Sequence, residues 1–290
     1  MVLLQLLING IQTGTIYALT AIGFALIFGS TRIFHFAHGA IFVIAAYVFK
    51  FTFGDLSLHW GIATIAAVST AVAVGLLVNF LIYVPIQRHE GSYFTIFVAS
   101  FGVVIVVQNA IAIIFGRGFV AIETPLSNAV EVVSGLLMAP LFGIALVCSV
   151  IILISLHLTL TRTHVGIALR ALSQNPELVR TFGLSTRRLS TYAFALGSAL
   201  VVPGAIFTGA VSGLNPTVGL HIMLISLVAT IAGGIGSIWG AAWIAFAIGV
   251  AENLVLWQMD SQWSEAVAFA FLLAFLIFRP AGLFRLASAR

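Results

Sequence analysis

Long apolar runs, separated by short segments that contain polar residues, glycine or proline, dominate the pattern of this chain. A helix needs about 20 predominantly apolar residues to cross the hydrocarbon core of a bilayer. The predicted spans are 3–28, 36–53, 60–84, 93–115, 137–160, 190–212, 219–234, 238–258 and 262–278. The pattern therefore predicts an all-α, polytopic membrane helix bundle of roughly eight to ten spans.

Two of these runs carry signs of a break. The run 36–53 opens on a polar cluster from His35 to Gly39, and the run 219–234 ends in closely spaced glycines. Transmembrane helices are interrupted in this way where their backbone lines a cavity, so either run is predicted to be broken or re-entrant. The first run has no basic residue before it and continues to Phe28, which predicts a retained helix rather than a signal peptide.

Composition narrows the class of protein further. Hydrophobic residues make up 61% of the 290 positions and charged residues only 7%, against about 25% charged residues in soluble domains. A soluble fold is excluded, and residues 1–290 are predicted to form a single transmembrane domain. The one cysteine, Cys148, can supply neither a disulfide framework nor a cysteine metal site.

The basic residues indicate the orientation. They form no nucleic-acid-binding face, whereas cytoplasmic loops of membrane proteins carry an excess of Lys and Arg. The arginines of segment 161–189 and of the C-terminal tail are Arg162, Arg170, Arg180, Arg187, Arg188, Arg279, Arg285 and Arg290. Both segments are predicted to be cytoplasmic, with Arg88 on the same side and the loop of Glu123 and Glu131 outside. An odd number of spans then leaves the N-terminus outside.

Within segment 161–189, the stretch SQNPELVRTFGL predicts a short helix with defined ends. Asn175 is a favourable N-cap, and Pro176 suits the first helical position. Glu177 complements the helix dipole, and Gly183 can adopt the left-handed conformation that ends a helix. A helix bounded so closely on both sides is expected to have a specific role in the loop.

The apolar residues of this short helix leave two interpretations open. Leu178 and Phe182 are four residues apart and share one face, while Arg180 points elsewhere. Such a helix can lie on the lipid surface. It can also dock onto a cytoplasmic partner, and this is the sharper hypothesis.

The sequence patterns of ATP hydrolysis and intramembrane proteolysis are missing. A P-loop needs a lysine beside its glycines, and the only lysine, Lys50, has no such loop. No Gly-x-Ser-Gly or Gly-x-Gly-Asp pattern occurs. We therefore expect no catalytic residue, and either a stand-alone ion-coupled carrier or channel, or a transport subunit driven by a separate ATPase. Glu252 lies late in its run, near Asn253 and the outer interface, and the other intramembrane polar residues, Asn79, Gln108 and Asn109, are neutral, which favours external coupling.

Two histidines raise the question of a metal. His35 and His38 are three residues apart, which places them on one helix face within reach of a common ion, but two ligands do not make a site. The polar lining of a pathway or a helix contact is the favoured interpretation, and no metal is expected.

Glycines cluster at 23–30 and 232–241. Small residues allow close helix packing, and paired glycine-interrupted spans also mark substrate sites in transporters. The positive end of a half-helix beginning near Phe36 or Ser237 is expected to face a carboxylate on the solute.

The segment NGIQTGTIYALTAIGFALIFGSTRIFHFAHGAIFVIAAY resembles the opening of the branched-chain amino acid type permeases of ABC importers. These permeases typically carry a Gly-x-Ile-Tyr-Ala-Leu run followed by Asn-Phe-Ala-His-Gly. The likeness continues in THVGIALRALSQNPELVRTFGL, NPTVGLHIMLISLVATIAGGIGSIWGA and RPAGLFR. His35 stands where the family usually has Asn, and Ala40 where an acidic residue is common, so the stretch is less polar and gains a ring that titrates near neutral pH.

The resemblance implies an inner-membrane permease subunit with the fold of the second class of ABC importers. It implies a paralogous permease or a second copy, two cytoplasmic ATPases that bind ATP and Mg²⁺, and a periplasmic solute-binding protein as partners. Transport would follow alternating access, with no cofactor in this chain. The solute stays open among branched-chain amino acids, urea, short amides, and aromatic or other organic acids.

The residues expected to carry these roles fall into two groups. The residues expected in the ATPase-docking loop are Gly166, Asn175, Glu177, Arg180 and Gly183. The residues expected near the translocation pathway are His35, Phe36, His38, Gly39, Asn215, Gly234 and Ser237.

Overall fold

The computed structural model of the chain describes residues 2–89, 91–133, 136–260, 263–278 and 282. The elements are α1 (Val2–Thr31), α2 (Ala37–Lys50), η1 (Phe51–Asp55), α3 (Trp60–Val78), η2 (Asn79–Tyr83), α4 (Val84–Arg88), α5 (Tyr93–Phe115), β1 (Val130–Val133), β2 (Leu136–Met138), α6 (Pro140–Arg162), α7 (His164–Gln174), α8 (Pro176–Thr181), α9 (Thr186–Val211), α10 (Val218–Gly233), α11 (Ile238–Val255) and α12 (Ser264–Phe278). About 80% of the chain is helical, as the apolar runs predict.

Seven helical stretches among the described residues are long and apolar enough to cross a membrane. They coincide with seven of the predicted runs, and the shorter α10 and α12 occupy the other two. The run 36–53 is not broken, because α2 continues into η1 as one 19-residue span, Ala37–Asp55. The run 219–234 is the short one: α10 has 16 residues and ends at Gly234, whose φ of 103° no ordinary helix adopts.

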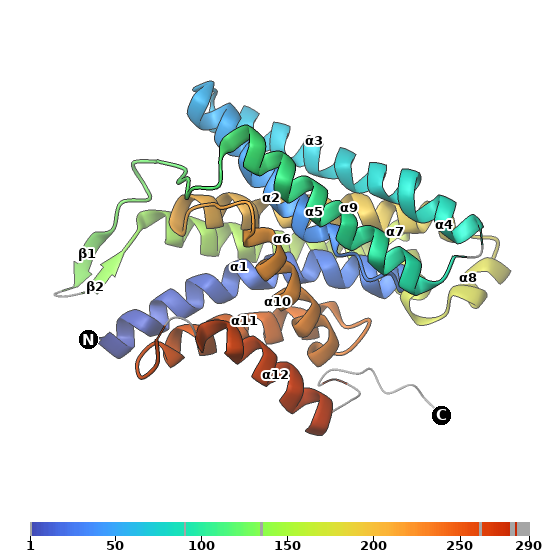
Figure 1. Cartoon of the computed structure of the whole chain (residues 1–290). Coiled ribbons are helices and arrows are strands. Elements are labelled where there is room, and N and C mark those ends of the chain that lie inside the picture. Colours follow the sequence, from blue (N-terminus) through green and yellow to red (C-terminus); the bar gives the residue numbers. More distant parts are fainter. Residues whose placement is uncertain (1, 90, 134–135, 261–262, 279–281, 283–290) are drawn as a thin grey trace.

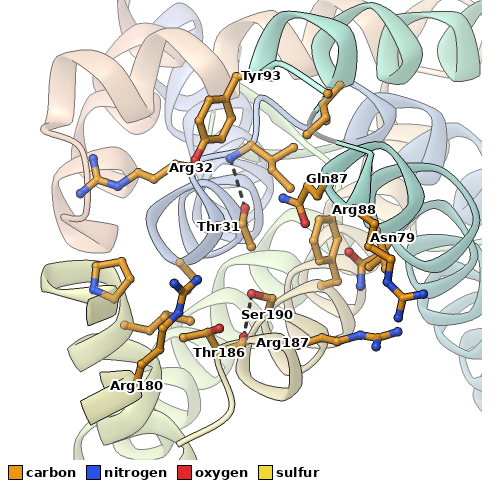
Figure 2. A pocket seen from close by; sticks show the side chains of 18 residues that line it. Thr31, Arg32, Asn79, Gln87, Arg88, Tyr93, Arg180, Thr186, Arg187 and Ser190 are labelled. Atoms are coloured by element: carbon orange, nitrogen blue, oxygen red, sulfur yellow. Dashed lines mark hydrogen bonds between the residues drawn. The ribbon is translucent and has the colours of Figure 1, made fainter. Parts of the chain in front are cut away.

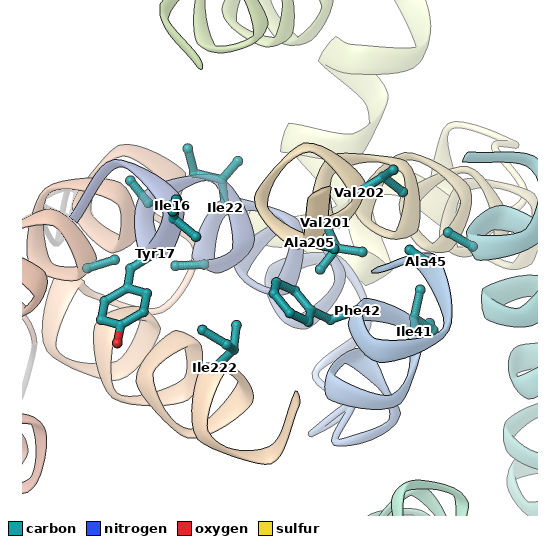
Figure 3. Packing of buried hydrophobic residues seen from close by; sticks show 14 of the residues in the cluster. Ile16, Tyr17, Ile22, Ile41, Phe42, Ala45, Val201, Val202, Ala205 and Ile222 are labelled. Atoms are coloured by element: carbon teal, nitrogen blue, oxygen red, sulfur yellow. The ribbon is translucent and has the colours of Figure 1, made fainter. Parts of the chain in front are cut away.

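The bundle is built around α1. In the most apolar 18-residue stretch of α1, 83% of the residues are buried, whereas the share is 22% in the equivalent stretches of α5 and α6. Helices α9, α10 and α11 pack against α1 (Figure 1). Figure 3 shows Ile16 and Ile22 of α1 near aliphatic side chains of α9 and Phe42 of α2. The outer faces of α5 and α6 are therefore available to lipid or to another subunit.

Glycine pairs allow the central helices to approach closely. A Cβ on Gly23 would lie 2.6 Å from the carbonyl oxygen of Gly197, which brings α1 against α9. A Cβ on Gly39 would meet the carbonyl group of Gly219 in the same way, between α2 and α10. Gly23 belongs to the first of the two predicted glycine clusters, so close packing through small residues, one of the two interpretations of those clusters, is observed there.

The two ends of the bundle differ in structure, as Figure 1 shows. The end that holds the N-terminus also holds the antiparallel hairpin of β1 and β2, and is called the hairpin end. The Gln5 side chain ties α1 to this hairpin, since its Nε2 donates to the carbonyl oxygen of Leu137 at 2.8 Å. The opposite end holds α4, α7 and α8 and is called the loop end.

The hairpin corrects one predicted boundary. The run 137–160 was expected to be helical from its first residue, but Leu137 pairs with Glu131 and Met138 with Val130 in the antiparallel ladder. Helix α6 begins only at Pro140, where proline is favoured because its missing N–H would be unpaired in a first turn.

Candidate functional site

The loop between α6 and α9 contains the predicted short helix. The Asn175 side chain caps α8, because its Oδ1 accepts hydrogen bonds from the backbone N–H groups of Glu177 (3.1 Å) and Leu178 (3.0 Å). Past the other end, Gly183 has a φ of 76° and its N–H donates to the carbonyl oxygen of Arg180 at 2.9 Å. The predicted N-cap and the predicted left-handed glycine are both confirmed.

Helix α8 turns one side chain inward and presents its other apolar groups outward. Val179 is 2% exposed, whereas Leu178 is 52% and Phe182 is 75% exposed. Glu177 and Arg180 are exposed beside them. The predicted apolar face therefore exists, and no described residue of this chain covers it.

Gly166 lies apart from this face. It is buried in the first turn of α7, where a Cβ would meet the backbone of Thr159 and Leu160 in α6. The hydroxyl of Thr163 caps α7 by accepting from the Gly166 N–H at 3.0 Å. Gly166 thus allows α7 to fold back on α6 and sets the direction of the loop.

A cavity of about 530 Å³ opens at the loop end, between α8 and the ends of several spans. It is called the arginine cavity, because Arg32, Arg88, Arg180 and Arg187 all line it (Figure 2). None of the described lining residues is acidic. Arg32 was not singled out by the sequence, and it occupies the left-handed region with a φ of 58° directly after α1.

His35, between α1 and α2, and His38, in the first turn of α2, are packed inside the bundle. His35 and His38 are both fully buried, and their ring centroids are 5.9 Å apart. His35 Nδ1 lies 2.7 Å from the hydroxyl of Tyr83, and His38 Nε2 donates to the carbonyl oxygen of Thr20 at 3.1 Å. No group of three His, Cys, Asp or Glu side chains comes together anywhere in the described part of the chain.

Burial changes the expected behaviour of His35. Desolvation lowers the pKa of this ring well below its ordinary value, and the nearby His38 lowers it further. The ring also packs edge-on against Phe194, with centroids 5.1 Å apart. His35 therefore stays uncharged at neutral pH, and the expectation of a ring that titrates there is wrong.

Asn215 lies at the other end of the bundle from Arg180. It lines a cavity of about 300 Å³ with Gln108, Asn109 and Arg117, called the hairpin-end cavity. Asn215 Oδ1 accepts from the backbone N–H of Thr217 at 3.0 Å, just before α10 begins.

Gly234 and Ser237 form the break between α10 and α11. Gly234 ends α10, and the Ser237 hydroxyl caps α11 by accepting from the Gly240 N–H at 3.1 Å. A helix does begin after Ser237 as predicted, but it is the 18-residue span α11 and not a half-helix. At Phe36, the start of α2 is covered, because the Phe36 N–H donates to the Ser100 hydroxyl at 3.3 Å and the Phe36 ring is 6% exposed.

Residues 6–276 match the family described as branched-chain amino acid transport system / permease component. The chain belongs to this family. BraD of Pseudomonas aeruginosa, a high-affinity branched-chain amino acid transport system permease protein, is 28% identical over 97% of this chain and 95% of its own length. LivH of Escherichia coli K12 is 26% identical over 97% and 94%, and LivM of the same strain is 24% identical over 92% and 67%.

The fold of this permease also recurs in a solved structure. PsaBC from Streptococcus pneumoniae in complex with Fab matches with a TM-score of 0.56 and 11% identity, over 94% of this chain and 91% of that one. The predicted family and all-helical fold are confirmed. The chain is a multi-pass inner-membrane protein, and a transport permease subunit rather than an enzyme.

Proposed function

We propose that this permease is the membrane-spanning subunit of an importer whose energy comes from separate cytoplasmic ATPases docked on loop 161–189. The main observation in support of this proposal is the capped helix α8 with Leu178 and Phe182 exposed. Exposed apolar side chains surrounded by polar ones are typical of protein contact sites. If α8 instead lies on the lipid surface, Phe182→Ala will leave ATPase co-purification unchanged in the test below.

Orientation supports the docking proposal. Arg88, Arg180 and Arg187 gather at the loop end, and the positive-inside rule assigns that end to the cytoplasm. The N-terminus and the loop with Glu131 then lie on the outer side, because the Gln5 side chain bonds to the β1–β2 hairpin. The outer side is where a periplasmic solute-binding protein would deliver its solute. Arg279, Arg285 and Arg290 of the C-terminal tail, which are also predicted to be cytoplasmic, lie outside the described residues.

Two exposed phenylalanines provide a matched test of docking. Phe182 at the loop end and Phe119 at the hairpin end are each 75% exposed. Tagged Phe182→Ala and Phe119→Ala permeases, extracted in mild detergent, should be compared with the wild type by mass spectrometry and ATPase assay of what co-purifies. The proposal expects Phe182→Ala alone to lose the ATPase. A permease that brings down no ATPase and transports by itself in liposomes would instead be a stand-alone carrier or channel.

The transported solute is proposed to be a branched-chain amino acid or a related small organic solute. Its support is the description of BraD and LivH as branched-chain amino acid permeases. The substitution of His35 for the usual Asn does not argue against this solute, because His35 is packed between Tyr83 and Phe194. Competition of radiolabelled leucine uptake by leucinamide, urea and benzoate tests it. Inhibition by the uncharged urea as strong as that by leucine would contradict an amino-acid substrate.

Alternating access is the proposed mechanism, with Asn215, Gly234 and Ser237 as pathway residues beside the two ends of the short helix α10. His35, Phe36, His38 and Gly39 stay predicted pathway residues. Because Phe36 is buried in this structure, a Phe36→Cys variant in a Cys148→Ser background should react with a small thiol reagent during ATP turnover and not at rest. Equal reaction in both conditions would remove this region from the pathway.

A further inference from the structure

The arginine cavity lies where spans leave the membrane. Helix α1 ends at Thr31, α4 ends at Arg88, α5 begins at Tyr93 and α9 begins at Thr186, and all four residues line the cavity. Span ends of this kind lie at the level of the lipid headgroups, where tyrosine is also enriched. The cavity therefore faces the phosphate layer of the leaflet at the loop end.

Its charge is positive and not neutralised by the described residues. Figure 2 shows Arg88 and Arg187 on one side of the cavity and Arg32 and Arg180 on the other. No acidic side chain lines it among the described residues. Four like charges around one cavity repel each other, and a bound anion would relieve that repulsion.

Donors remain available inside the cavity. Arg32 uses one Nη2 contact, to the carbonyl oxygen of Ser173 at 3.3 Å, which leaves other guanidinium N–H groups for a ligand. The hydroxyls of Thr31 and Ser190 donate to carbonyl groups of their own helices, at 2.7 and 2.9 Å. The arginines and the side chain of Asn79, which is 4% exposed, are thus available to hold an anion, and Gln87, Tyr93 and Thr186 add further polar groups to the lining.

Size and surroundings indicate the class of anion. The volume of about 530 Å³ far exceeds the roughly 30 Å³ that one water occupies, so a phosphoglycerol group fits. Apolar side chains within two residues of the lining in sequence are exposed, with Leu81 at 69% and Phe94 at 72%. Planar guanidinium groups match the geometry of phosphate oxygens, and acyl chains can lie along the apolar side chains.

We propose that the arginine cavity binds the phosphate of an anionic phospholipid from the leaflet at the loop end, through Arg32, Arg88, Arg180 and Arg187. Basic pockets between transmembrane helices bind anionic headgroups in this way. A lipid in this cavity contacts Pro176 and Arg180 of α8 and the ends of α1 and α9 at once. It therefore fixes the loop relative to the spans.

Native mass spectrometry of the purified permease with dioctanoyl phosphatidylglycerol tests the proposal. The double variant Arg32→Gln/Arg187→Gln removes two cavity charges, and Arg162→Gln/Arg188→Gln removes two loop-end charges that do not line the cavity. We expect phosphatidylglycerol affinity to fall at least about tenfold in the cavity variant and less than about twofold in the control. Equal elution volumes and melting temperatures of the two lipid-free variants verify that both fold.

Further arms identify the source of the phosphate. Glycerol 1-phosphate that displaces the lipid at equal concentration would show that a free phosphate ester is the ligand rather than a lipid. Phosphatidylcholine bound as tightly as phosphatidylglycerol, or wild-type lipid affinity in the cavity variant, would overturn the proposal. A cavity variant that keeps lipid binding but loses a co-purifying ATPase would identify the cavity as a protein contact instead. The lipid-affinity readouts require neither transport nor a bound ATPase, so failure of this proposal can be told apart from failure of the proposed function.

Discussion

Removal of the α8 cap is the perturbation whose effect can be worked out most directly. In the wild type, Asn175 Oδ1 accepts from the N–H groups of Glu177 and Leu178, at 3.1 and 3.0 Å. Replacing an N-cap Asn by Ala costs about 1 kcal/mol of helix stability, which is about a fivefold change in the ratio of formed to unformed helix. A helix of six residues has little else to hold it, since only Val179 is buried.

Hydrogen exchange measures this change. The amides of Val179 and Phe182 bond to the carbonyl oxygens of Asn175 and Leu178, so their exchange follows the opening of α8. In Asn175→Ala we expect both amides to exchange about fivefold faster. Asn175→Ser is the matched control, because serine caps about as well as asparagine, and its rates should stay near those of the wild type.

Two results would refute this reasoning. Exchange in Asn175→Ala that equals the wild type would mean that the cap does not hold α8. Exchange in Asn175→Ser as fast as in Asn175→Ala would mean that the side chain acts in another way. If α8 opens as expected and ATPase co-purification is unchanged, α8 is not the docking element.

Other substitutions follow from the packing. Gly39→Ala puts a methyl group against the α10 backbone and should lower the unfolding free energy by about 1–3 kcal/mol in detergent. Gly102→Ala, which has open space around it, should be neutral or slightly stabilising. Equal melting temperatures of these two variants would contradict the packing argument. Tyr83→Phe leaves His35 Nδ1 unpaired and should cost about 1–3 kcal/mol in the same melt, and no loss would show that the 2.7 Å contact is unimportant. Gly183→Ala, at a φ of 76°, should cost about 1–2 kcal/mol and speed exchange at the end of α8. An unchanged rate there would contradict the left-handed requirement.

The span positions could be predicted because the bilayer sets one strong requirement, a long apolar run. The capped helix α8 could be predicted for a similar reason: the cap at Asn175 and the left-handed Gly183 are local effects that act within a few residues. Which face of each span is buried could not be predicted. Lipid and protein interior are both apolar, so α3 and α5 carry no polar stripe to mark an outer face.

The arginine cavity could not be predicted from the sequence for a different reason. Its four arginines come from four separate segments, at positions 32, 88, 180 and 187, and only the packing of span ends brings them together. The signal available in the sequence was the excess of arginine on one side, which gives orientation but not convergence. The complete burial of His35 and His38 was hidden likewise, since the contacts with Tyr83 and Phe194 lie far away in sequence.

The central claim is that a separate ATPase binds loop 161–189, and cross-linking tests it most directly. Leu178 and Leu137 are 52% and 53% exposed at opposite ends of the bundle, so single cysteines at these positions, in a Cys148→Ser background, react under matched conditions. With a short bifunctional thiol reagent in membranes, Leu178→Cys is expected to cross-link to an ATPase subunit and Leu137→Cys is not. An ATPase cross-link from Leu137→Cys, with none from Leu178→Cys, would contradict both the docking site and the orientation.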